Sequence, residues 1–324
     1  MAINLLDIQP HKVSKDLSGY ITYIYGAGKT GKTTLASQMD GALLIAFEKG
    51  YNALPGIKAQ DVSTWGEFKQ VIRELKKTEV KQVFKSIVID TVDIAATLCE
   101  KYVCSQNDVE KLSDIPYGGG WAIVKKEFEE NFRVITQQGY ALFFISHAKD
   151  KVFKREDGTE YNQIIPSLAN TYNEIVKNMA DIYGYAHQVR TESGTSVNLT
   201  LRSPDGSVDT GCRFKYIQPE IPFTYQALAD ALSVAIDKEA ELTDNRFVTT
   251  ERQIETMPVE RDFNEVMKEF QEIAKTLMDR DSNNAAVISG TAEKYLGKNK
   301  KVSECTDKQI ELVELIINDL KPLV

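Results

Sequence analysis

Residues 24–39, "IYGAGKTGKTTLASQM", decide the fold of this chain. Within them, residues 26–33 match the phosphate-loop pattern G-x-x-x-x-G-K-[ST] at every fixed position. The preceding "YITYIYG" is rich in β-branched and aromatic residues and predicts a strand, while "KTTLASQM" predicts a helix. Glycines let successive backbone N–H groups point at phosphate oxygens, and the helix N-terminus adds a positive dipole end. This context predicts a nucleotide-binding α/β protein and disfavours a chance glycine turn.

We expect this loop to bind ATP together with Mg²⁺. Lys32 is expected to neutralise the β and γ phosphates, and Thr33 is expected to give its hydroxyl to the metal. The residues expected to bind the nucleotide here are Gly26, Ala27, Gly28, Lys29, Thr30, Gly31, Lys32, Thr33 and Thr34.

Two carboxylates follow apolar runs and are candidates for the chemistry beside this loop. The run "SIVIDT" leads to Asp90, which we expect to be the second Mg²⁺ contact. The run "LLIAFE" ends in Glu48, which we expect to orient or deprotonate water at the same edge of the sheet. Either could instead be an ordinary carboxylate at a strand end, and Asp93 is more simply explained as a helix N-cap.

The organisation of the chain follows from its hydrophobic periodicity. From residue 19 to residue 218 short apolar runs alternate with segments of helical period, which predicts βαβ units and a mainly parallel sheet. Three later runs, separated by the turn signals "ESGT" and "PDGS", predict antiparallel strands that extend it. We expect an N-terminal segment (1–18), an α/β core (19–242), a polar linker (243–262) and a small helical C-terminal module (263–324).

Composition excludes several classes of protein. The chain of 324 residues has a net charge of −8, so any positive surface for nucleic acid must be local. It has no apolar run long enough to span a membrane and no secretory signal pattern, which predicts a cytoplasmic location without a membrane partner. Its four cysteines lack metal-ligand spacing and are expected to be reduced, packed thiols.

With these residues together, the chain resembles the RecA-like recombinase ATPases, and most closely the phage-encoded single-strand-annealing ATPases, which are AAA-type ATP-binding proteins. The likeness covers residues 19–223. "AFEKGYNALPG", with Glu48, follows the phosphate loop, and the Asp90 strand comes next. The Gly-rich "SDIPYGGGWAIVKKEF" then stands where the family has its first DNA-binding loop. The resemblance implies a RecA-like P-loop core in which Glu48 and Lys32 are catalytic.

The resemblance also implies a γ-phosphate sensor at the end of "ALFFISH". His147 stands where bacterial RecA has a glutamine, and it could otherwise be a simple polar terminator of the strand. The family's second DNA-binding loop would then be residues 148–168, where Phe153 and Tyr161 are interleaved with basic residues. Cations neutralise a nucleic-acid backbone and rings stack on bases, although the turn signal "REDGTE" equally fits a solvated β-hairpin. The expected DNA-binding residues are Lys149, Lys151, Lys154 and Arg155.

A further implied site is shared between subunits. Arg213 and Lys215 in "CRFKYIQPEIPF" resemble two basic residues of the family that reach the ATP of a neighbouring subunit. The chain would then be a homo-oligomer, filament or ring, with ATP at subunit interfaces. Both residues could instead be edge-strand charges that discourage aggregation.

The sequence leaves three functions open. The first is a DNA-stimulated ATPase that binds single-stranded DNA and promotes annealing or strand exchange in phage recombination, in the cytoplasm of the bacterial host. The second is a RecA-fold helicase or helicase-loading ATPase of phage DNA replication, although no extra helicase motif is evident. A small-molecule phosphotransferase is disfavoured, because no acceptor pocket or lid signature is evident. A single-strand-binding protein is a further candidate partner, through the C-terminal helical module.

Overall fold

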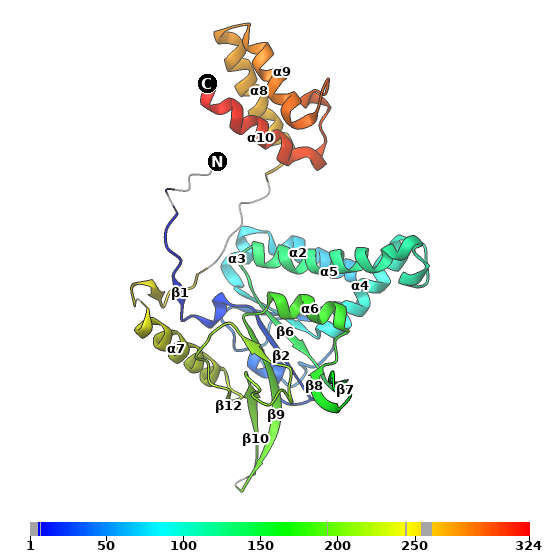
Figure 1. Cartoon of the computed structure of the whole chain (residues 1–324), viewed down its shortest axis with the longest axis vertical. Helices are drawn as coiled ribbons and strands as arrows, with labels where there is room; N and C mark the ends of the chain where they lie inside the picture. The colour runs from blue at the N-terminus through cyan, green and yellow to red at the C-terminus, as the bar shows by residue number, and fades with distance from the viewer. Residues whose placement is uncertain (1–5, 7, 193, 244, 254–260) are drawn as a thin grey trace. The chain divides into compact units, whose positions relative to one another are not determined.

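Figure 1 shows a computed structural model of the chain, in which the described residues are 6, 8–192, 194–243, 245–253 and 261–324. The chain divides into two compact units, one within residues 10–257 and the other within residues 1–9 and 258–324. The larger unit contains the phosphate loop and the candidate site around it. No helix among the described residues is long and apolar enough to cross a membrane.

The larger unit is built on a nine-stranded sheet with the order β12-β10-β9-β2-β6-β5-β3-β4, in which β11 also pairs with β9. The neighbours from β9 to β4 are parallel, and β10, β11 and β12 add antiparallel pairs. The strands are β2 (Thr22–Gly26), β3 (Ala42–Ala46), β4 (Ala59–Asp61), β5 (Ser86–Asp90), β6 (Ala141–Ser146), β9 (Ile182–Thr191), β10 (Gly194–Thr200), β11 (Gly211–Cys212) and β12 (Glu220–Pro222). The predicted fold class, an α/β core with a mainly parallel sheet extended by antiparallel strands, is confirmed.

One predicted strand direction needs correction. The first of the three runs expected to be antiparallel, β9, is parallel to β2 and antiparallel only to β10 and β11. The reason is the connection before it, because α6 (Asn170–Met179) returns the chain to the amino end of the sheet. A strand that follows such a crossover enters the sheet parallel to its neighbour.

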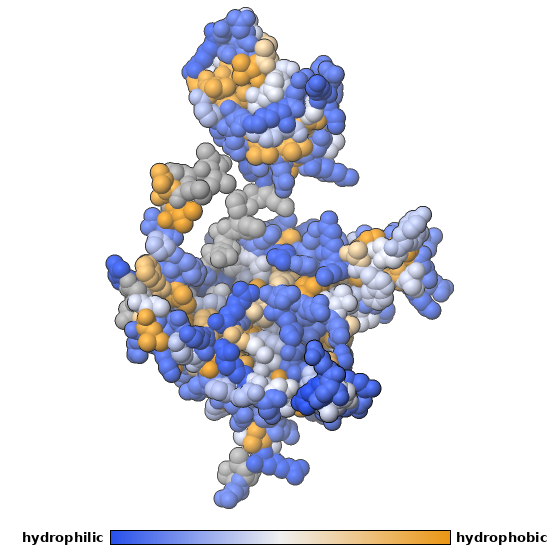
Figure 2. All heavy atoms as spheres, viewed as in Figure 1, coloured by the Kyte–Doolittle hydropathy of each residue, from blue (hydrophilic) through white to orange (hydrophobic). Residues whose placement is uncertain are grey.

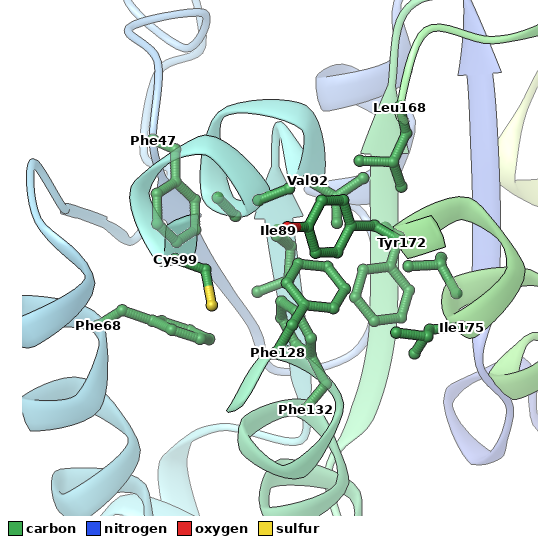
Figure 3. Packing of buried hydrophobic residues seen from close by; sticks show 14 of the residues in the cluster. Phe47, Phe68, Ile89, Val92, Cys99, Phe128, Phe132, Leu168, Tyr172 and Ile175 are labelled. Carbon is green, nitrogen blue, oxygen red and sulfur yellow. The ribbon is translucent and has the colours of Figure 1, made fainter. Parts of the chain in front are cut away.

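Helices cover both faces of the sheet and enclose two hydrophobic cores. One core joins the sheet to α2 (Trp65–Leu75), α4 (Val92–Gln106), α5 (Gly119–Gln137) and α6 (Figure 3). The other core lies against α1 (Lys32–Ala36) and α7 (Tyr225–Leu242). Phe68, Ile72 and Leu75 form the buried stripe of α2, as its helical periodicity requires, and a capping box of Thr64 and Glu67 starts this helix. The short helix α3 (Thr78–Val83) leads into β5.

Part of the stretch predicted to be a linker packs on the larger unit. Strand β13 (Val248–Thr249) pairs in parallel with β1 (Val13–Ser14) near the amino edge of the sheet. Arg252 follows and donates hydrogen bonds to the carbonyls of Ser18 (2.9 Å), Lys85 (2.8 Å) and Gly139 (3.0 Å). These carbonyls precede β2, β5 and β6, so one guanidinium ties together the starts of three strands. Residues 254–260 of the predicted linker lie outside the described residues.

The smaller unit is a three-helix module of α8 (Phe263–Arg280), α9 (Asn284–Leu296) and α10 (Ile310–Leu320). Its core takes Val266, Ile273 and Leu277 from α8 and the apolar face of α10. The apolar face of α10 is therefore used for packing within the module. The four cysteines of the chain are free thiols, and Cys99 and Cys104 are buried.

Candidate functional site

The phosphate loop leaves the carboxyl end of β2 and leads into α1. A Cβ at Gly26 would lie 2.3 Å from the carbonyl oxygen of Ala186 on β9, so this position admits only glycine. Lys29 (φ 63°) and Gly31 (φ 91°) have left-handed backbones that turn the chain back on itself. The Thr30 hydroxyl donates to the carbonyl of Ala27 at 3.0 Å and closes the loop.

Lys32 lies beneath this loop, with 5% of the residue exposed. Its ammonium group donates to the carbonyls of Gly26 (2.8 Å) and Ala27 (2.7 Å). Burial lowers the pKa of Lys32, although the charges of Asp90 and Glu48 oppose this shift. The lysine therefore stands beside the position where the loop amides converge, as a phosphate-binding lysine requires.

Asp90, at the end of β5, meets the first turn of α1. The hydroxyl of Thr33 donates to Oδ2 of Asp90 at 2.7 Å, and Asp90 is 2% exposed. Burial raises the pKa of this carboxyl group, while the bond from Thr33 lowers it. The structure thus brings together the two side chains predicted to bind Mg²⁺, and their oxygen donors suit this hard cation.

Gly50 is a residue of this site that the sequence analysis did not single out. A Cβ at this position would lie 3.7 Å from Oδ2 of Asp90 and 3.8 Å from Oγ1 of Thr33. A larger side chain here would extend over the two oxygens. The available signal was its place two residues after Glu48, but a lone glycine in a polar loop is not specific.

The carboxylate of Glu48 lies at the same edge, next to the end of β6. Its Oε1 is 3.6 Å from Nε2 of His147. The backbone N–H groups of Phe47 (2.7 Å) and Glu48 (3.2 Å) donate to the Asp90 carbonyl, which holds the ends of β3 and β5 together. Parallel strands place their carboxyl ends at one edge, and this is why Glu48, Asp90 and His147 meet beside the phosphate loop.

Asp93 differs from its predicted role as a helix N-cap. The N-cap of α4 is Thr91, and Asp93 lies within the first turn. Its Oδ1 instead accepts a hydrogen bond of 2.5 Å from the hydroxyl of Ser167. The residue is therefore used for a contact between distant segments, because the helix already begins at Val92, one residue before it.

Residues 148–168, predicted to be a basic loop or a β-hairpin, contain a β-hairpin. It consists of β7 (Ala148–Lys154) and β8 (Glu160–Pro166) and follows His147 directly. The rings of Phe153 and Tyr161 stack across it, with centroids 5.6 Å apart. The Lys151 ammonium lies 4.7 Å from the Phe153 ring, and the Arg155 guanidinium lies 4.9 Å from the Tyr161 ring.

This arrangement divides the four predicted DNA-binding residues between two faces. Lys149, Lys151 and Phe153 are spaced two residues apart along β7 and therefore lie on one face of the hairpin. Arg155 reaches the same face, where its guanidinium lies over the Tyr161 ring. Lys154 points to the opposite face, where its ammonium is 3.5 Å from the carboxylate of Glu160. The surface over the hairpin is strongly hydrophilic (Figure 2).

Arg213 and Lys215 lie away from the phosphate loop of their own chain. Nε of Arg213 is 3.2 Å from Oδ1 of Asp181, which immediately precedes β9 at the amino edge of the sheet. Lys215 is exposed, and its ammonium lies 5.0 Å from the Tyr216 ring. Both are on the surface and outside the site described above, so a role at ATP could only be played toward another copy of the chain.

The order of the strands and the residues at their ends define the class of protein. Strand β6 lies between the phosphate-loop strand β2 and the Asp90 strand β5, and Glu48 follows the end of β3, the next strand along. This is the arrangement of a P-loop nucleoside triphosphatase.

The chain belongs to the family described as "AAA domain", whose model matches residues 18–220. It is 31% identical over 337 residues to the "SPbeta prophage-derived uncharacterized protein YorG" of Bacillus subtilis (strain 168). The matched region covers 100% of this chain and 99% of that protein. The solved structure of the KaiC-like protein PH0186 from Pyrococcus horikoshii OT3 covers 65% of this chain and 94% of its own, with 12% identity and a TM-score of 0.36. Membership of the family implies nucleotide binding at the phosphate loop.

Proposed function

We propose that this protein is an ATP-dependent, single-stranded-DNA-binding recombination protein of phage or prophage type, which promotes annealing or strand exchange in the bacterial cytoplasm. One observation carries the proposal. A hairpin with a cationic and aromatic face begins at His147, whose ring lies 3.6 Å from the candidate catalytic carboxylate of Glu48. The prophage origin of the relative with 31% identity supports the phage assignment.

The proposed ligand of the phosphate loop is ATP with Mg²⁺. The convergent oxygens of Thr33 and Asp90 fit the metal, which supplies charge neutralisation when it is bound. Lys32 binds the phosphates, and Glu48 orients a water molecule and accepts its proton. His147, beside Glu48 and before the hairpin, senses the γ phosphate.

The proposed substrate is single-stranded DNA, because the hairpin combines cations with two half-buried aromatic rings. Bases stack on aromatic rings only where they are not already paired in a duplex, and lysine and arginine neutralise the phosphates. The Phe153–Tyr161 pair, with Lys151 and Arg155 over the two rings, provides both groups on one face.

The first test is the ATPase rate of the full chain with and without single-stranded DNA. We expect DNA to stimulate hydrolysis in the wild type and Lys32→Ala to abolish hydrolysis. If DNA neither binds nor changes the wild-type rate, the proposed function is wrong. Strand-directed translocation or duplex unwinding would instead assign the protein to the helicase class.

A sharper test uses the two faces of the hairpin. Lys151→Ala combined with Arg155→Ala should weaken DNA binding and lower the salt slope by about 0.7 for each lost phosphate contact. Lys154→Ala, on the opposite face of the same hairpin, is the matched control and should change binding much less. Equal losses for both variants would contradict the assignment of the face.

A site shared between subunits is also proposed, because Arg213 and Lys215 are exposed and lie away from the phosphate loop of their own chain. In a homo-oligomer, Arg213 and Lys215 of one protomer would contact ATP held by the next, and the C-terminal module would bind a single-strand-binding protein. Mixing Arg213→Ala with Lys32→Ala protein should restore part of the ATPase activity if the residues act in different protomers. ATPase activity that is unaffected by both Arg213→Ala and Lys215→Ala would rule out the shared site.

A further inference from the structure

The two ends of the β7–β8 hairpin are joined to each other at its base. The backbone N–H of Ser167, just after β8, donates to the carbonyl of His147, just before β7, at 2.8 Å. The ammonium group of Lys149 donates in turn to the carbonyl of Ser167 at 2.9 Å. A displacement of either end is therefore carried to the other end and to the first residues of β7.

One end of the hairpin is also bonded to the helix that begins at the metal-site strand. The Ser167 hydroxyl donates to Oδ1 of Asp93 at 2.5 Å across 74 positions of sequence. Asp93 stands in the first turn of α4, three residues after Asp90, which accepts the hydroxyl of Thr33. A short chain of residues thus runs from the phosphate loop to the base of the hairpin.

Ser167 is the described side chain that is hydrogen-bonded to the Asp93 carboxylate. Oδ2 is buried and has no hydrogen-bond partner among the residues that the structure describes. Ser167 is the side chain that holds the carboxylate in place, so the carboxylate and the hairpin base are positioned together.

We propose that the Asp93–Ser167 contact passes the state of the nucleotide site to the β7–β8 hairpin, with both residues acting as positioning residues. The distances favour this route over the one through His147. The 3.6 Å between Nε2 of His147 and Oε1 of Glu48 is too long for a hydrogen bond, whereas the Ser167 hydroxyl is hydrogen-bonded to the Asp93 carboxylate. A nucleotide that shifts the end of β5 moves the first turn of α4, and Ser167 follows.

The proposal is tested by amide hydrogen exchange of residues 148–166 in the full chain, with and without a non-hydrolysable ATP analogue and Mg²⁺. The wild type should show a nucleotide-dependent change in exchange, and Ser167→Ala should lose it. Ser167→Thr keeps the hydroxyl and should retain it. Nucleotide affinity, measured with a fluorescent analogue, should be the same in all three proteins, because Ser167 does not contact the phosphate loop.

A matched control separates this contact from general effects on α4. The Thr97 hydroxyl donates to the Asp93 carbonyl at 3.2 Å on the exposed side of the same helix. Thr97→Ala should leave the exchange response intact. If Ser167→Ala does not fold, Asp93→Asn removes the charge at nearly constant shape and should reduce the response. A full response in Ser167→Ala, or no response in the wild type, would overturn the proposal.

The inference rests on the proposed function in one respect, namely that the ligand of the hairpin is single-stranded DNA. DNA affinity in the presence of the ATP analogue and of ADP is therefore measured in parallel. One hydrogen bond to a charged group can carry a coupling of roughly tenfold to a hundredfold, which sets the largest affinity ratio that Ser167→Ala can remove. If no DNA binds but the exchange response depends on Ser167, the proposed function fails and the positioning contact stands.

Discussion

Replacing Arg252 with alanine should destabilise the larger unit, although the residue lies beyond the last helix of that unit. Its guanidinium donates three hydrogen bonds of 2.8–3.0 Å to carbonyls that precede β2, β5 and β6. Without Arg252, two of these carbonyls, those of Ser18 and Gly139, lose the partner described above. The Lys85 carbonyl keeps a bond from the backbone N–H of Ala141.

The size of the effect follows from these bonds. A hydrogen bond to a charged group contributes about 1.5–3 kcal/mol, and the lower end applies here because the side chain is half-buried and water can replace part of it. The loss of two to three such bonds gives about 3 kcal/mol. With a urea slope of about 3 kcal/mol per M, the unfolding midpoint should fall by about 1 M.

Tryptophan fluorescence measures this unfolding selectively. The only two tryptophans of the sequence, Trp65 and Trp121, belong to α2 and α5, so the signal reports on the larger unit alone. Arg73→Ala, which removes an exposed arginine of α2, is the control and should change stability by no more than about 0.5 kcal/mol. If Arg252→Ala also lowers the free energy of unfolding by no more than about 0.5 kcal/mol, with an unchanged dependence on urea concentration, the reasoning is refuted.

Three further predictions concern the nucleotide site. Gly26→Ala would place a Cβ 2.3 Å from the Ala186 carbonyl oxygen and should lower the urea midpoint, whereas Gly28→Ala, whose Cβ meets nothing within 4 Å, should not. Burial lowers the pKa of Lys32 in the folded protein, so between that pKa and 10.5 the unfolded chain binds more protons than the folded one. The free energy of unfolding of the free protein should therefore rise with pH in this range. ATP affinity should fall over the same range, because Lys32 loses the charge that binds the phosphates. A fluorescent-ATP titration from about pH 8 to pH 10 measures this fall, which Lys32→Arg should lack because arginine keeps its charge. Glu48→Gln should leave ATP binding unchanged and slow phosphate release by about 10²–10⁴-fold, and an unchanged rate would exclude Glu48 as the base.

The sequence was sufficient for those parts of the site that are contiguous or lie at strand ends. The phosphate loop is one uninterrupted motif, so its neighbours in sequence are also its neighbours in space. Glu48, Asp90 and His147 each follow an apolar run, and the rule that parallel strands end at one edge predicts that they meet. The stripe of α2 was likewise predictable, because a helix repeats its buried face every three to four residues.

Other features depend on contacts that no local pattern encodes. The bond of Arg252 to Ser18 joins residues 234 positions apart, and that of Ser167 to Asp93 joins residues 74 positions apart. A lone arginine in a polar stretch and a lone serine after a strand have the same local appearance whether they are solvated or bonded. The direction of β9 was missed for a related reason, since turn signals show where strands reverse but not where a crossover helix has returned the chain.

The insertion of β6 between β2 and β5 also bears on how such a protein can be modified. The segment after Ser146 begins next to Glu48, and its two ends are already closed by the bond from Ser167 to His147. The base of the hairpin is held to the rest of the larger unit through Ile164, which is bonded to Tyr25, Ser207 and Asp209. Residues 152–162, the outer part of the hairpin, are therefore the part that could be exchanged. A designer could graft a recognition hairpin for another ligand onto this base, which would keep its place beside Glu48.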